Sequence, residues 1–399
     1  MTDAPAFPSV AKQSLTPDPL LDELRRQAPV VRIRPPYGGE CWLVTRYDDV
    51  RAVQTNPRFS RQAMVGKDMS RTAPFPLQGG SIVEMDPPEH TRVRRIVSKA
   101  FAAKRVEALR PRAQDIVDAL LDDLMKAGKD GAAVDLVDGL CMPLPISMIC
   151  EVLGVAYEDR SKFASWARVF MSSSAHTAEE IVEAHGRLMG YLGELVAARR
   201  AHPTDDLLAA LVTVRDEGDS LTEDELVNLG FSLLVGGFET TAAQLGKFIL
   251  FLLLHPDELA LLRARPELVP SAIEELLRLV NLAAGTSLAW VATHDVELGG
   301  VTIRAGDAVM ASAAAANLDD SVFDAPDRFD ITRDPNPHVA FGHGAHFCIG
   351  AHLARMELQV AIGTLVTRFP GVLLAVPADD VPWRVGSAVW GVEHLPVLL

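Results

Sequence analysis

The longest helical pattern in the sequence sets the strongest limit on the fold. Thr222 and Glu225 have the spacing of a capping box, and apolar periodicity then continues to Leu254, before His255-Pro256 stops it. At about 1.5 Å per residue, this pattern predicts a helix roughly 50 Å long. An apolar helix of that length must be buried along much of its length, so the rest of the chain has to fold around it.

The other patterns are mostly helical, with short strands between them. The expected elements are a strand over 40–45, a helix over 47–54, further helices over about 91–201, 270–280 and 351–369, small hairpins turning at Gly299-Gly300 and Gly306, and short strands in the tail. The 399 residues contain no Gly/Ser linker, charge block or repeat at which to divide the chain. We therefore expect a single large domain over residues 1–399, mainly α with small β-sheets and a long central helix.

The net charge and the pattern of apolar residues argue against two classes of partner. The formal net charge of −15 argues against nucleic-acid binding, which usually needs a basic face. The opening MTDAPAFPSVAKQS lacks the basic-then-apolar order of a signal peptide, and the apolar run over 248–254 is too short to span a bilayer. We expect a cytoplasmic protein with no membrane and no nucleic-acid partner.

A glycine-rich loop surrounds one cysteine. FGHGAHFCIG, residues 341–350, places three glycines and two histidines around Cys348. A helix beginning at Ala351 would direct unpaired N–H groups and the positive end of its dipole toward the sulfur, which favours a thiolate. The glycines would let a large flat group, such as a metal-bearing ring, approach the backbone.

Two alternatives remain for this loop. Cys348 could be a buried cysteine in a glycine turn, or it could bind zinc together with His338, His343 and His346. The remaining cysteines lie among apolar residues, where cysteine usually acts as a small core side chain; they are Cys41, Cys141 and Cys150.

Polar residues also interrupt the long helix. LLVGGFETTAAQ contains Gly236 and Gly237, each costing about 1 kcal/mol in a helix relative to alanine. It also places Glu239 and Thr240 in an apolar run, where an unpaired carboxylate would be costly. The stretch is either functional or a polar stripe that faces solvent.

Two weaker patterns involve charged residues. In EELLR, Glu275 and Arg278 lie one helical turn apart. An exposed ion pair at this spacing contributes little to stability. In DPPEHTRVRR, His90 and Arg94 share one helix face, which could simply be solvated.

Together the motifs resemble the cytochrome P450 haem-thiolate monooxygenases, and the likeness runs from TRYDDVRAV near Thr45 to HLPV near His394. The resemblance implies the cytochrome P450 fold, with Cys348 as the thiolate ligand of a haem b iron. It implies that Gly236 and Gly237 make room for dioxygen at a local widening of the helix, while Glu239 and Thr240 relay protons to the distal oxygen. It also assigns a structural ion network to Glu275 and Arg278 with the arginine of PDRF, Arg328.

The resemblance assigns further residues to the haem. His90, Arg94 and His346 would bind propionates. The ligand loop would contribute Phe341, Gly342 and Gly350. The sequence departs from the family at Trp290 and Leu318, where relatives usually have arginine. The change at Trp290 removes one propionate clamp.

The implied activity uses O2 to hydroxylate or otherwise oxidise a hydrophobic small molecule, as in bacterial natural-product tailoring. The expected substrate-site walls are mostly apolar, as at Met64, Phe75, Leu77 and Leu288. The sequence has no cysteine cluster and no GxGxxG after a strand, so electrons from NAD(P)H would come through a separate ferredoxin and its reductase. A basic ridge is a plausible docking surface: Arg92, Arg95, Lys99 and Lys104.

Other readings stay open. A phenol-coupling or peroxide-using variant would share the same motifs. A haem sensor or carrier without turnover would not need the acid and alcohol of the long helix.

Overall fold

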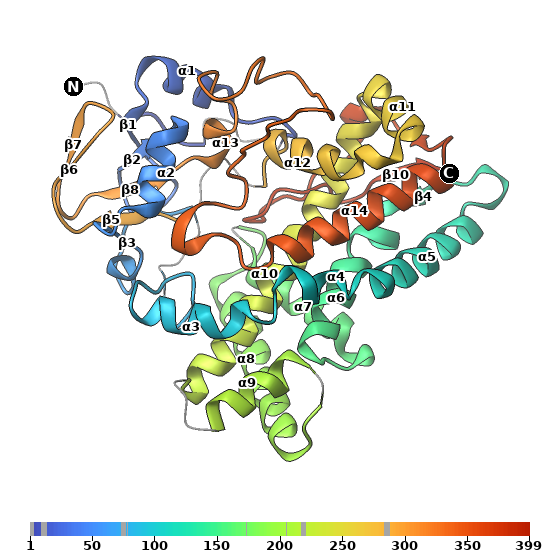
Figure 1. The fold of residues 1–399 in the computed structure, drawn as a ribbon, viewed down its shortest axis with the longest axis horizontal. Coiled ribbons are helices and arrows are strands. Elements are labelled where there is room, and N and C mark those ends of the chain that lie inside the picture. Colours follow the sequence, from blue (N-terminus) through green and yellow to red (C-terminus); the bar gives the residue numbers. More distant parts are fainter. Residues whose placement is uncertain are drawn as a thin grey trace. The chain divides into compact units, whose positions relative to one another are not determined.

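A computed structural model describes residues 4–8, 14–72, 77, 79–172, 174–204, 206–216, 221–282 and 288–399. The chain forms two compact units. Unit 1 comprises residues 1–79, 83–91 and 274–348, and unit 2 comprises residues 80–82, 92–273 and 349–399. Figure 1 labels most of their helices and strands.

Unit 1 is built on a five-stranded sheet with the order β1-β2-β8-β5-β3. The strands are β1 (Val30–Ile33), β2 (Cys41–Val44), β8 (Ala308–Ala311), β5 (Trp290–Ala292) and β3 (Phe59–Ser60). Only the β2–β8 pair is parallel. A separate hairpin joins β6 (Val296–Leu298) to β7 (Val301–Ile303) through Gly299-Gly300, so that predicted turn is confirmed.

Alternation along the strands places apolar side chains on both faces of this sheet. In β2, Cys41 and Leu43 belong to one apolar cluster and Val44 to another. In β8, Met310 belongs to the cluster of Cys41 and Leu43, and Val309 belongs to the cluster of Val44. This is the two-residue period of a strand whose two faces are covered.

The helices of unit 1 are short. They are α1 (Pro19–Gln27), α2 (Tyr47–Thr55) and α13 (Ala313–Ala316). Two further helices pass from one unit into the other, α3 (Glu89–Ser98) and α12 (Val269–Leu279).

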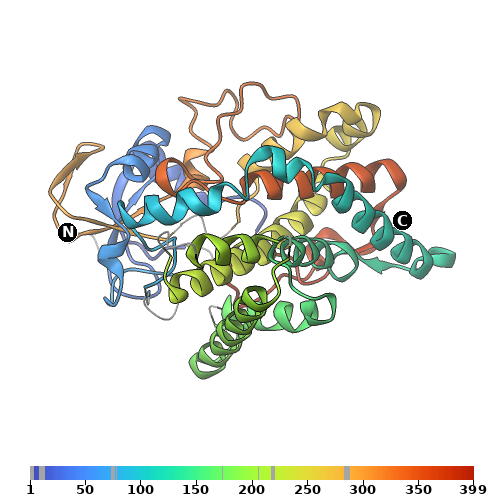
Figure 2. The same cartoon turned by 60° about the horizontal axis from the view of Figure 1, so that its bottom comes forward.

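Unit 2 is mainly helical. Its helices are α4 (Ala103–Glu107), α5 (Arg110–Ala127), α6 (Pro143–Leu153), α7 (Arg160–Phe170), α8 (Ala178–Ala201), α9 (Leu207–Asp216), α10 (Glu223–Leu253), α11 (Pro256–Ala264) and α14 (Ala351–Arg368). A small sheet has the order β4-β10-β9, from β4 (Val134–Asp135), β10 (Pro396–Leu398) and β9 (Leu373–Leu374). Helices α7 and α8 pack together as a pair, coloured green in Figure 2.

The predicted long helix is α10, with 31 residues. Both halves of its capping box form: the Thr222 hydroxyl accepts from the N–H of Glu225, and the Glu225 carboxylate accepts from the N–H of Thr222. The helix packs against α6, α8 and α14. Its length and composition would suit a membrane span, but 67% of its most apolar window is buried inside the fold, as in the core helix of a soluble protein.

Candidate active site

The cysteine loop adopts a tight, glycine-dependent path in unit 1. Gly342 and Gly344 have φ angles of 75° and 71°, in the left-handed region that favours glycine. The backbone N–H of Cys348 donates to the carbonyl of Phe341 at 2.8 Å, which closes the loop. Cys348 is exposed, whereas the other three cysteines are buried, as predicted.

Packing against a neighbouring helix is a second reason why residue 344 must be glycine, and the sequence alone does not show it. A Cβ at this position would lie 2.6 Å from the carbonyl oxygen of Gln54, near the end of α2. The loop can therefore approach α2 only with glycine there. Helix α14 begins at Ala351, as predicted, and its N-cap residue Gly350 has no side chain to bond the first-turn N–H groups.

Two histidines predicted to serve the same cofactor lie side by side. The ring centroids of His90, at the start of α3, and His346, in the cysteine loop, are 4.3 Å apart. His90 is only 2% exposed. Arg94 follows His90 by one turn on α3 and is half-buried.

The histidines of the zinc alternative have other partners. Nε2 of His338 lies 2.9 Å from Oε2 of Glu274. Nε2 of His343 lies 3.3 Å from Nη2 of Arg51. Within the described part of the chain, the group of possible metal ligands that converges is Asp135, Asp138 and His394, so the zinc reading has no support in the geometry.

The glycine pair of α10 has two different environments. A Cβ on Gly236 would meet no atom within 4 Å, whereas a Cβ on Gly237 would lie 3.0 Å from the side chain of Ile149 in α6. The expected widening is not seen as a break, because α10 is a continuous α-helix from Glu223 to Leu253. Instead, the Thr240 hydroxyl donates to the carbonyl of Gly236 at 2.6 Å.

Glu239 is a buried acid with a partner that the sequence did not identify. It is 1% exposed, and its Oε1 is paired with Nη1 of Arg384, from the segment that precedes β10. Its Oε2 has no hydrogen-bond partner among the described residues. Nε of Arg384 also lies 3.3 Å from Oε2 of Glu393, whose side chain is 42% exposed. Glu239 is thus not part of a polar stripe facing solvent.

Several charged groups surround the Arg384 guanidinium. Burial is the largest effect and lowers the pKa of Arg384, and the charge of Arg168 acts in the same direction. Glu393 and Asp138 oppose this shift. A buried carboxylate in an apolar run requires a nearby cation, but only the fold reveals which cation that is.

The predicted ion network exists with a different third arginine. Glu275 and Arg278 form a fully buried ion pair at 2.8 Å. Arg333, not Arg328, provides the second guanidinium, with Nε 3.1 Å from Glu275. The prediction of Arg328 was wrong because its side chain is 68% exposed and faces Asp330, and only its backbone carbonyl accepts from Arg278.

The basic ridge is also smaller than predicted. Arg92 forms an ion pair with Glu225 at the start of α10. Arg95, Lys99 and Lys104 are exposed on α3, α4 and the turn between them.

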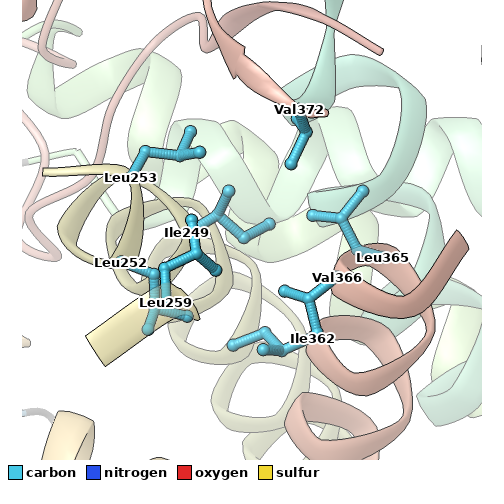
Figure 3. A pocket seen from close by; sticks show the side chains of 8 residues that line it. All are labelled: Ile249, Leu252, Leu253, Leu259, Ile362, Leu365, Val366 and Val372. Carbon is cyan, nitrogen blue, oxygen red and sulfur yellow. The ribbon is translucent and has the colours of Figure 1, made fainter. Parts of the chain in front are cut away.

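A small apolar hollow in unit 2 is not a candidate active site. It is lined by aliphatic side chains of α10, α11 and α14, together with Val372 (Figure 3). Its lining from α10 begins at Ile249, nine residues beyond Thr240, and includes no polar side chain. Of the predicted substrate walls, Phe75 lies outside the described residues, Met64 is buried, Leu77 is half-buried and Leu288 is exposed.

Comparisons with known proteins agree with the motifs. The cytochrome P450 family model matches residues 260–375. Nocardicin C N-oxygenase of Nocardia uniformis subsp. tsuyamanensis is 49% identical over 397 residues, 99% of each chain. Mycinamicin IV hydroxylase/epoxidase of Micromonospora griseorubida is 47% identical over 98% of each chain. The crystal structure of the LnmA cytochrome P450 hydroxylase, from the leinamycin pathway of Streptomyces atroolivaceus S-140, has a TM-score of 0.92 and 51% identity, and covers 99% of this chain and 100% of that one.

The chain belongs to the cytochrome P450 family, and its fold is the mainly α fold of that family. It is a monooxygenase, an oxidoreductase that incorporates oxygen into its substrate. Its residues fit the haem of the family. The cysteine loop offers an exposed thiol, and two adjacent imidazoles lie in the same unit.

Proposed function

We propose that this protein is a tailoring monooxygenase that hydroxylates, or otherwise inserts one oxygen atom of O2 into, a hydrophobic natural product in the cytoplasm. The support is that the relatives reported above are named as oxygenases and hydroxylases acting on nocardicin C and mycinamicin IV, or in the leinamycin pathway. The proposal treats residues 1–399 as one functional domain. NAD(P)H would supply the electrons through a ferredoxin and its reductase.

Haem b is the cofactor in this proposal, and Cys348 is its iron ligand. When bound through a cysteine thiolate, haem iron activates dioxygen, because the thiolate donates electron density that favours O–O cleavage. The residues proposed to hold the haem are His90, Arg94, Phe341, Gly342, His346 and Gly350. Imidazole and guanidinium N–H groups are suitable donors to propionate carboxylates.

The observation that carries the catalytic assignment is the buried acid next to an alcohol on α10. The Thr240 hydroxyl donates to the Gly236 carbonyl, so its oxygen keeps a lone pair that can accept a hydrogen bond from another donor. Glu239 follows Phe238, is 1% exposed, and presents Oε2 without a hydrogen-bond partner in the described structure. We assign proton transfer toward oxygen to these two side chains. Of the two glycines, Gly236 leaves open space for O2, whereas Gly237 makes room for the side chain of Ile149.

Arg384 has a positioning role in this proposal. It pairs with the buried Glu239 carboxylate and also contacts the half-exposed Glu393. When the guanidinium turns toward Glu393, the Glu239 carboxylate is released and can exchange protons with solvent through water.

The proton assignment can be tested after a substrate is found by spin-shift titration of a compound library. Thr240→Ala should keep NAD(P)H consumption near normal, while product per NAD(P)H falls about tenfold or more and hydrogen peroxide rises. Glu239→Gln should slow turnover, because the amide cannot deliver a proton. The matched control is Thr241→Ala, at the buried neighbouring threonine, which should remain coupled. If Thr240→Ala forms product with unchanged coupling, the assignment is wrong.

A further inference from the structure

Arg61 and Trp290 form a cross-strand pair in unit 1. Strands β3 and β5 are antiparallel, with Phe59 opposite Ala292 and Ser60 opposite Val291. One more residue along this register places Arg61 opposite Trp290, and opposed residues of an antiparallel pair project from the same face. The Arg61 guanidinium carbon lies 4.3 Å from the Trp290 ring centroid, a cation–π contact.

The Arg61 guanidinium is a buried cation that contacts no carboxylate among the residues that the structure describes. Arg61 is 8% exposed; its Nη1 donates to the carbonyl of Val83 at 3.1 Å, and its Nε has no partner among the described residues. The negative charge that acts on Arg61 is that of Asp86. The Asp86 oxygens accept hydrogen bonds from the backbone N–H of Arg61 and from the Ser60 hydroxyl, not from the guanidinium. Burial lowers the pKa of Arg61 to about 10.

A buried cation that contacts no carboxylate among the described residues is suited to binding an anionic ligand. Burying a charge without a counter-charge is costly, so buried charges are usually paired. Haem b brings two carboxylates, and Cys348, His90 and His346 belong to the same unit as Arg61. Trp290 itself carries no charge, and the Arg61 cation lies directly across the strand pair from it.

We propose that Arg61, held flat against Trp290, binds a haem propionate and supplies the charge that residue 290 does not provide. The inference rests on haem being the cofactor, as in the proposed function. Trp290 acts as a positioning residue, because its ring fixes the plane of the guanidinium and thus the direction of its N–H groups.

The test measures the rate at which purified holoprotein loses haem to excess apomyoglobin. Arg61→Ala should lose haem about 10- to 100-fold faster than the parent protein, as expected for a lost hydrogen bond to a charged group. Arg61→Lys should fall between the two. The control is Arg58→Ala, a nearby exposed arginine, which should lose haem at the parental rate.

Two further measurements separate propionate binding from a purely structural role. Reconstitution with haem dimethyl ester, whose propionates are neutral, should abolish the difference between the parent protein and Arg61→Ala. Adding Trp290→Arg to Arg61→Ala should slow haem loss again, because the new guanidinium projects from the same face.

The outcomes distinguish this inference from the proposed function. Parental haem loss in Arg61→Ala, or an equal defect with the dimethyl ester, would overturn the propionate assignment while leaving haem binding intact. Failure of the parent protein to take up haem would instead refute the proposed function.

Discussion

At the scale of single residues, Glu275 shows how a buried charge can be tolerated. Its two oxygens accept from Arg278, Arg333, the side chain of Asn336 and the backbone N–H of Asp330. Two guanidiniums and two further donors compensate for the loss of hydration. The sequence shows Glu275 and Arg278 at helical spacing, but Arg333 lies 58 residues away in the chain, and only the tertiary fold selects it over Arg328.

Removal of this carboxylate is predicted to destabilise the protein strongly. Glu275→Ala leaves two buried guanidiniums without their counter-charge, which should cost about 3–5 kcal/mol. Urea unfolding followed by circular dichroism measures the change. Arg328→Ala removes an exposed side chain and should cost under about 1 kcal/mol. Equal losses in the two variants would show that the structure assigns the wrong arginine.

At the scale of elements, local signals identify α10 and α14 well. The capping box of α10 and the start of α14 at Ala351 depend on neighbouring residues, so the sequence predicts them correctly. The role of Gly344 and the partner of Glu239 depend on the approach of α2 and of the segment before β10, which no local pattern encodes. The same limit applies to Arg61, whose partner lies on a strand more than 200 residues away.

The pairing of β4 with β10 predicts a pH-dependent contribution to stability. The hydrogen bond from His394 Nδ1 to Asp135, 2.6 Å long, is the main cause of a raised pKa for His394, and Asp138 and Glu393 add to it. A raised pKa in the folded state means that the stabilisation is complete below the unfolded-state pKa of about 6.5 and is lost as pH rises through the folded-state pKa.

His394→Gln should therefore destabilise the protein more at pH 5.5 than at pH 9. The effect should be under about 1 kcal/mol, because the His394 side chain is half-exposed. Thermal melts at the two pH values measure it, with the exposed His202→Gln as control. A larger loss at pH 9 would contradict the assigned direction.

At the scale of the whole molecule, the charge balance is strongly acidic, yet four exposed basic side chains, Arg105 among them, lie close together in the sequence on α3, α4 and their connecting turn. Arg95, Lys99 and Lys104 stand out against a net charge of −15. Such a patch would steer an acidic protein such as a ferredoxin toward this region.

Charge reversal tests this docking surface. Arg95→Glu combined with Lys99→Glu should weaken ferredoxin binding about tenfold or more at low salt, with a smaller effect at high salt, because salt screens exposed charges. Lys126→Glu, an exposed change elsewhere in unit 2, is the control. Unchanged ferredoxin affinity in the double variant would show that these residues do not form the docking surface.

The central claim is that the Cys348 thiolate binds a haem iron. The most direct measurement is the visible spectrum of the dithionite-reduced protein under carbon monoxide, for the parent chain and for Cys348→His. The parent should show the red-shifted Soret band of thiolate-ligated carbonyl haem, and Cys348→His should bind haem but show the band of a nitrogen-ligated one. A thiolate band that survives in Cys348→His, or a parent protein that gives no thiolate band, would contradict the claim.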